Sequence, residues 1–257
     1  MPHLESIGVG GGVRRLAGGL AELLWPTRCA GCDAPGALLC EGCRSRVVVI
    51  DQAWACPRCG APFGSLVCTE CTDCLVADDP DAPRAGTLGH LAELDAVCCY
   101  GVHDWPLDEA IRAYKDAGER RLAPLLAEML ASALGATRAF DPSRADAIAF
   151  VPSTPGAFAR RGFDHMEPVA RALSGLLGIP VRDALARRDA RDQRGLSRAG
   201  RLENAHGATI PVDDMPGARV LLVDDVLTTG ATLSQAARAL RLSGALQVFG
   251  ACVSRAW

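Results

Sequence analysis

The chain has 257 residues, 49% of them hydrophobic, which is enough for one large or two small domains with a buried core. Its formal net charge of -3, from 30 acidic and 27 basic residues, argues against a uniformly basic nucleic-acid-binding protein. The 12 cysteines are the unusual feature, and most occur as close pairs in the first third of the chain. Without a signal-peptide pattern, such pairs indicate metal binding rather than disulfides.

Residues 1–28 combine a glycine cluster with a short apolar stretch that Glu22 interrupts. The stretch is too short and too broken for a signal peptide or a membrane span. We therefore expect an amphipathic segment, no membrane span and a cytoplasmic location. The glycines follow no predicted strand, so they do not form a dinucleotide-binding fingerprint.

Residues 29–78 predict a double zinc ribbon, because each C-x-x-C turn brings two thiolates to one ion and two turns complete a tetrahedral shell for Zn²⁺. The first predicted site comprises Cys29, Cys32, Cys40 and Cys43. The second comprises Cys56, Cys59, Cys71 and Cys74. Cys68 with Cys71 is the alternative to the pair of Cys71 and Cys74.

The all-cysteine composition of both sites indicates structural zinc, since such sites keep no open position for chemistry. A short segment with few large apolar residues also needs the metal to fold. A redox dithiol is the rival interpretation, but none of these pairs follows a strand at the start of a helix.

Residues 79–90 are rich in proline, glycine and acidic residues, which predicts a linker. From residue 91 to 257, strand and helix patterns alternate, which predicts an α/β domain with a largely parallel sheet. The predicted strands cover residues 96–100, 146–151, 220–223 and 246–254. The predicted helices cover residues 107–114, 122–134 and 233–242. We expect Cys98 and Cys99, inside the first strand, to be packing residues.

The predicted strand at residues 220–223 leads into a polar motif that suits a phosphorylated ligand. Asp224 and Asp225 come first, and a loop with Thr228, Thr229, Gly230 and Thr232 precedes the last helix. Open α/β sheets bind ligands at the carboxyl ends of their strands. Backbone N–H groups at a helix N-terminus suit phosphate, and the acids suit sugar hydroxyls or a metal.

Two basic segments lie between the predicted strands. Residues 158–165 include Arg160 and Arg161, and residues 187–204 are dense in arginine. The arginine side chain pairs with two phosphate oxygens at once, so the second segment is predicted to be a loop that closes over an anion. A solvated charged face is the alternative.

Several motifs together resemble the ComF family (competence protein F and GntX-like proteins). They are Cys-Pro-Arg-Cys-Gly at 56–60, Arg-Arg-Gly-Phe at 160–163, Gly-Leu-Ser-Arg at 195–198 and the acidic motif at 220–232. The last of these resembles the phosphoribosyl-pyrophosphate (PRPP) signature of type I phosphoribosyltransferases. The resemblance implies a phosphoribosyltransferase-like α/β domain with a parallel sheet, preceded by a small zinc-ribbon domain.

The resemblance also implies roles for individual residues. Asp224 and Asp225 would hold the ribose hydroxyls and serve as the catalytic carboxylates. The 5′-phosphate would lie in the loop of Thr228, Thr229, Gly230, Ala231 and Thr232. Pro152 and Ser153 would form the pyrophosphate loop, Arg160 and Arg161 would neutralise pyrophosphate, and Mg²⁺ would bridge pyrophosphate and ribose. The family usually has Asn-Gln where this chain has Asp164 and His165.

Two function classes follow from the resemblance. In the first, the protein binds PRPP and transfers the phosphoribosyl group to an unidentified acceptor, in DNA uptake and competence or in nucleotide metabolism. In the second, it binds PRPP, a nucleotide or single-stranded DNA without turnover, as an adaptor for a DNA-translocating helicase or ATPase. Fold alone does not decide between these classes.

Overall fold

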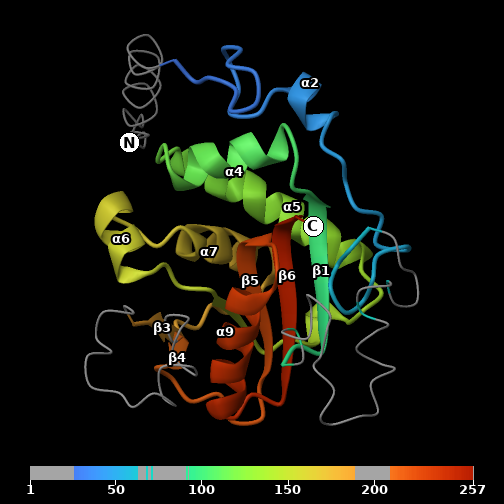
Figure 1. The fold of residues 1–257 in the computed structure, drawn as a ribbon, viewed down its shortest axis with the longest axis vertical. Helices are drawn as coiled ribbons and strands as arrows, with labels where there is room; N and C mark the ends of the chain where they lie inside the picture. Colours follow the sequence, from blue (N-terminus) through green and yellow to red (C-terminus); the bar gives the residue numbers. More distant parts are fainter. Residues whose placement is uncertain are drawn as a thin grey trace, which may run out of the picture.

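The computed structural model describes residues 26–62, 68, 71, 91, 93–188 and 209–256. Its centre is a four-stranded sheet in the order β1-β6-β5-β2, in which every neighbouring pair is parallel (Figure 1). The strands are β1 (Ala96–Val102), β2 (Ala147–Phe150), β5 (Arg219–Leu227) and β6 (Gln247–Arg255). The predicted linker at 79–90 and all of residues 1–25 lie outside the described residues.

Helices cover both faces of the sheet. One face carries α4 (Leu107–Lys115), α5 (Ala123–Ala136) and α7 (Met166–Leu177), and the other carries α9 (Ala231–Leu242). Shorter elements are α2 (Glu41–Arg44), η2 (Arg120–Leu122), η3 (Pro142–Arg144) and α6 (Pro155–Arg161). Strands β3 (Leu185–Arg187) and β4 (Thr209–Pro211) form a separate antiparallel pair.

Strand β5 shows why a run of apolar residues belongs at the centre of such a sheet. Leu221 and Val223 pack against the α5 and α7 face, whereas Val220 and Leu222 pack against α9. All four side chains are fully buried. Because a strand's successive side chains point to opposite faces, a strand covered on both sides needs an uninterrupted apolar run.

The cysteine-rich part is divided between the two faces. Cys29, Leu39 and Cys43 belong to the core on the α4 side, whereas Cys56 and Cys59 belong to the core on the α9 side. Figure 1 shows this segment, in blue, passing over α4, through α2 and then down beside the edge strand β1. A bridge between Val49 and Gly101 and a bond from the Val97 N–H to the Pro57 carbonyl attach it to β1.

The predicted strands and helices of the α/β domain are confirmed, and one boundary needs correction. The sequence predicts that the apolar strand ends at residue 223, but β5 continues to Leu227 and includes Asp224 and Asp225. The reason is that β6 keeps pairing with β5 beyond this point, with Asp224 opposite Cys252 and Leu227 opposite Arg255. Among the described residues, no helix has both the length and the apolar character to cross a membrane.

Candidate functional site

A polar cleft of about 330 Å³ opens where β2 ends before its neighbour β5 does. The last paired residues of β2 and β5 are Phe150 and Val223, after which β5 runs on alone on that side. Asp224 and Asp225 therefore lie next to the loop that follows β2. The cleft is at the carboxyl ends of the parallel strands, where open α/β sheets bind their ligands.

Most of the residues predicted to bind PRPP line this cleft. They are Pro152, Ser153, Arg161, Asp224, Asp225, Thr228, Gly230 and Thr232. Three residues predicted to bind PRPP do not line it, namely Arg160, Thr229 and Ala231. Four polar lining residues were not predicted as site residues, and they are Lys115, Thr154, His165 and Arg187.

The two carboxylates have different partners. Asp225 Oδ2 lies 2.6 Å from Lys115 Nζ and 3.2 Å from His165 Nε2, whereas Asp224 Oδ1 accepts the N–H of Asp225 at 2.9 Å. Burial disfavours ionisation of Asp225, but the hydrogen bonds and charges of His165 and Lys115 outweigh it and lower its pKa. Burial and then the Asp225 charge raise the pKa of Asp224 well above its ordinary value. The cleft thus favours one ionised and one neutral carboxyl.

Asp164 and His165, where the chain departs from the family pattern, hold the loop that follows β2. His165 Nδ1 lies 2.8 Å from Ser153 Oγ, and the Ser153 N–H donates to Asp164 Oδ2 at 2.6 Å. Asp164 Oδ1 also accepts the Met166 N–H at the start of α7. The His165 carbonyl accepts the buried Tyr114 hydroxyl. Since His165 also approaches Asp225, it links the β2 loop to the end of β5.

The turn from β5 into α9 requires a glycine. Gly230 has a φ of 81°, and a Cβ atom there would lie 2.6 Å from Leu91 Cδ2. Both the left-handed backbone and the close approach disfavour a larger side chain. The turn brings Thr228 and Thr232 to the cleft at the N-terminus of a 12-residue helix. Such an N-terminus favours a negatively charged ligand.

Basic side chains line the other side of the cleft. Arg161 is largely buried, with its side chain 12% exposed, and pairs with Asp116 at 3.1 Å. Arg187 Nε is buried and has no hydrogen-bond partner among the described residues. The rest of the predicted arginine-rich loop, residues 189–204, lies outside the described residues. Arg160 is exposed and does not line the cleft.

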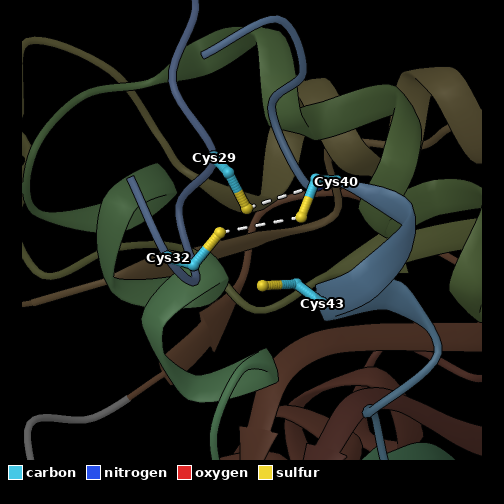
Figure 2. Close-up of side chains that lie close together, drawn as sticks. All are labelled: Cys29, Cys32, Cys40 and Cys43. Atoms are coloured by element: carbon cyan, nitrogen blue, oxygen red, sulfur yellow. Dashed lines mark hydrogen bonds between the residues drawn. The ribbon is translucent and has the colours of Figure 1, made fainter. Parts of the chain in front are cut away.

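The first predicted cysteine group is a compact cluster of four thiols (Figure 2). The sulfur atoms of Cys32 and Cys40 lie 3.7 Å apart, and the Cys40 N–H donates to Cys29 Sγ at 3.2 Å. A tetrahedral zinc ion with bonds of about 2.3 Å places its sulfur ligands about 3.8 Å apart. Cys29, Cys32, Cys40 and Cys43 therefore fit a structural zinc ion.

The second cluster comprises Cys56, Cys59, Cys68 and Cys71, whose sulfur atoms all lie within 4.8 Å of one another. Cys59 Sγ is 3.5 Å from Cys68 Sγ, so these four thiols complete a shell of zinc dimensions. The geometry therefore favours the alternative pair, Cys68 with Cys71, over the predicted pair of Cys71 with Cys74. Cys74 itself lies outside the described residues. Cys98 and Cys99 are buried in the sheet and join neither cluster.

Comparison with family models divides the chain in the same way. A model of the double zinc ribbon domain matches residues 20–75, and a model of the phosphoribosyl transferase domain matches residues 157–255. With the two cysteine clusters, the first match supports structural zinc in the N-terminal part. With the parallel sheet, the second identifies a phosphoribosyltransferase-like α/β fold.

Two similar proteins are a competence protein and a DNA utilization protein. Competence protein F of Haemophilus influenzae is 30% identical over 220 residues, which cover 82% of this chain and 89% of that protein. The DNA utilization protein YhgH of Escherichia coli K12 is 30% identical over 242 residues, covering 90% of this chain and 97% of that protein.

Among solved structures, the chain is similar to the glutamine PRPP amidotransferase of B. subtilis complexed with ADP and GMP. The two are 22% identical, the TM-score is 0.37, and the match covers 51% of this chain. The chain spans only 25% of the length of that protein.

Proposed function

Because the chain belongs to the competence protein F family, we propose that its phosphoribosyltransferase-like domain binds PRPP or a closely related phosphorylated ribose. One observation carries the proposal. Asp224 and Asp225 lie on the part of β5 that extends beyond the end of β2, beside the glycine-threonine turn at the start of α9. This places groups suited to ribose hydroxyls next to groups suited to a phosphate.

The cleft offers a separate contact for each part of such a ligand. Asp224 and Asp225 would accept hydrogen bonds from the ribose hydroxyls, and Thr228, Gly230 and Thr232 would surround the 5′-phosphate. Pro152 and Ser153 would face the pyrophosphate. Basic side chains at the cleft would then balance the phosphate charges, and these are Lys115, Arg161 and Arg187.

The residues also fit the Mg²⁺ ion that accompanies PRPP. One ligand atom each from His165, Asp224 and Asp225 lies within 4.8 Å of the others, and carboxylate oxygens are preferred ligands of Mg²⁺. When bound, Mg²⁺ would neutralise charge on the pyrophosphate. In this arrangement Lys115 would exchange its contact with Asp225 for a phosphate oxygen, which leaves the carboxylate available.

If the group is transferred, the bond between the anomeric carbon and pyrophosphate breaks, and the acceptor's electron pair forms the new bond to that carbon. The electrons of the broken bond leave with pyrophosphate, and the acceptor's proton passes to solvent. The ionised carboxylate Asp225 would stabilise positive charge that develops on the ribose ring. The basic groups of the cleft would stabilise the departing anion.

Titration calorimetry with PRPP and Mg²⁺ tests the proposal. We expect Asp224→Asn with Asp225→Asn to reduce affinity by at least a factor of about 10, since a hydrogen bond to a charged group is worth about 1.5–3 kcal/mol. Asp213→Asn serves as the control, because Asp213 pairs with Arg182 on the exposed surface. Equal affinity in all three proteins would remove the PRPP assignment.

The second candidate is a non-catalytic adaptor that binds single-stranded DNA and a DNA-translocating helicase or ATPase. The names of the relatives favour it, since one is a competence protein and the other a DNA utilization protein. Pyrophosphate release from PRPP in a metabolite extract would indicate group transfer. A salt-dependent affinity for single-stranded DNA, without pyrophosphate release, would indicate the adaptor.

A further inference from the structure

Arg255, at the end of β6, is a buried cation between the second cysteine cluster and the turn of residues 228–230 before α9, here called the phosphate turn. Its residue exposure is 2%, and it is among the largest fully buried side chains. Leu227, the last residue of β5, lies opposite it in the sheet. A buried guanidinium is costly unless its N–H groups are hydrogen-bonded, so its partners define its role.

The Arg255 side chain joins two parts of the chain that are far apart in sequence. Its Nε donates to the carbonyl of Cys59 at 3.2 Å, and Cys59 is one of the four thiols of the second cluster. Its Nη1 donates to the carbonyls of Leu227 at 3.2 Å and Thr228 at 2.9 Å. Thr228 lines the cleft. One planar group therefore connects a zinc ligand to the proposed phosphate turn.

The Cys59 carbonyl has its position because of the tight turn around the cluster. Gly60 adopts a φ of 66°, its N–H donates to the Cys56 carbonyl at 2.8 Å, and a Cβ atom there would lie 2.7 Å from Cys99 Sγ. Segments of this kind obtain their folding free energy largely from the metal. Loss of the second zinc ion would release Cys59 and with it one of the acceptors of Arg255.

We propose that Arg255 is a positioning residue that couples the second zinc site to ligand binding in the cleft. With zinc bound, Arg255 is held from the Cys59 side and fixes the carbonyls of Leu227 and Thr228, so the phosphate turn is preorganised. The identity of the ligand rests on the proposed function, whereas the coupling of the turn to zinc rests on the contacts of Arg255 alone.

Coupling between two binding sites is reciprocal. If zinc at the second site favours binding of a phosphorylated ribose, the ligand must favour retention of that zinc by the same factor. A residue that contributed only to general stability would not produce this mutual effect between the two sites.

The first test compares wild type with Arg255→Lys, which keeps the charge but lacks the planar set of donors. The control is Arg241→Lys, because Arg241 also donates to backbone carbonyls, those of Glu93 and Leu246, and to the Asp95 carboxylate, away from the cleft. We expect R255K to keep two zinc ions and to bind PRPP with Mg²⁺ roughly tenfold more weakly, the effect of about one lost charged hydrogen bond. R241K should bind as wild type does. Unchanged affinity in R255K would overturn the proposal.

The second test measures zinc release to a colorimetric chelator. In wild type, PRPP with Mg²⁺ should slow the release of one of the two zinc ions, and in R255K it should not. Identical release with and without bound PRPP in wild type would also overturn the proposal. The comparison within wild type needs no variant, so it remains decisive if R255K does not fold.

A third measurement separates failure of this inference from failure of the proposed function. If wild type does not bind PRPP, the function is wrong, but amide exchange can still test the coupling without ligand. Cys71→Ser removes a ligand of the second zinc site. In both this variant and R255K, the amides of residues 228–233 should exchange faster than they do in wild type and R241K. Equal exchange in all four proteins would refute the coupling itself.

Discussion

His165 is the residue at which the structure adds most to the sequence. An Asp-His pair in place of the usual Asn-Gln gave no clear role, because a sequence does not reveal which side chains meet across a fold. In the structure His165 is 6% exposed and joins Ser153 Oγ to the Asp225 carboxylate. It therefore holds together the two loops between which the proposed ligand would lie.

We expect His165→Ala to weaken PRPP binding by a factor of about 10, because it removes a buried partner from both Ser153 and Asp225. Ser153→Ala should have a smaller effect, since it breaks only one of these contacts. Titration calorimetry on both variants gives the comparison. The bridging role would be wrong if H165A bound as tightly as wild type.

The ion pair of Asp146 and Arg219 predicts a pH effect on stability. The hydrogen bonds from Arg219 lower the pKa of Asp146 from 3.8 to about 2. A lowered pKa in the folded state contributes stability above the unfolded value, and this contribution disappears as the pH falls from 3.8 towards 2. The pair is solvent-exposed, so the effect should be small.

Urea unfolding of wild type and Asp146→Asn checks this. Wild type should be the more stable protein at pH 6, and the difference between the two midpoints should shrink below pH 3.8. A difference that stays constant down to pH 2 would show that the pair contributes nothing through its charge.

At the scale of elements, the sequence predicted the position of the cleft better than the end of β5. The apolar run at 220–223 and the polar residues after it were enough to predict a site at a strand end, and the structure has a cleft there. The true end of β5 depends on β6, which pairs with it as far as Leu227, and this pairing has no signature in the run itself. Lys115 was missed for a similar reason, since it reaches Asp225 from the end of another element, α4.

The turn between β5 and α9 depends on Gly230, and Gly230→Ala should disrupt it. The left-handed φ of 81° is unfavourable for alanine, and the new Cβ would lie 2.6 Å from Leu91 Cδ2. We expect a loss of about 1–3 kcal/mol in the free energy of unfolding, together with weaker PRPP binding.

Gly178→Ala is a matched control, because Gly178 also has a positive φ, 72°, but a Cβ there would meet nothing within 4 Å. G178A should carry the backbone strain alone, with unchanged PRPP affinity. Denaturant unfolding and calorimetry on the two variants separate the contact with Leu91 from the strain. Equal losses in both would mean that Leu91 moves aside.

At the scale of the molecule, the pattern of cysteines predicted two metal clusters but not where they lie. Spacing determines which thiols can share an ion, and for the second cluster it left Cys68 and Cys74 as competitors. The burial of each cluster determines how much it contributes to the stability of the fold. Every cysteine of the second cluster is buried in the core on the α9 side, whereas Cys32 of the first cluster is exposed.

This difference predicts unequal effects of losing each zinc ion. Metal analysis should give close to two zinc ions in wild type and one in both Cys32→Ser and Cys56→Ser. Cys98→Ala is the control for cavity effects, since Cys98 is buried but belongs to neither cluster, and it should retain both ions.

The melting temperature should fall further for C56S than for C32S. In C56S the lost metal leaves uncompensated polar groups inside the core that also packs on the sheet and α9, so the α/β domain is destabilised with the ribbon. In C32S the damage should stay near the surface. A larger fall for C32S would mean that the first ribbon, through its contacts at α4, is the more important support of the domain.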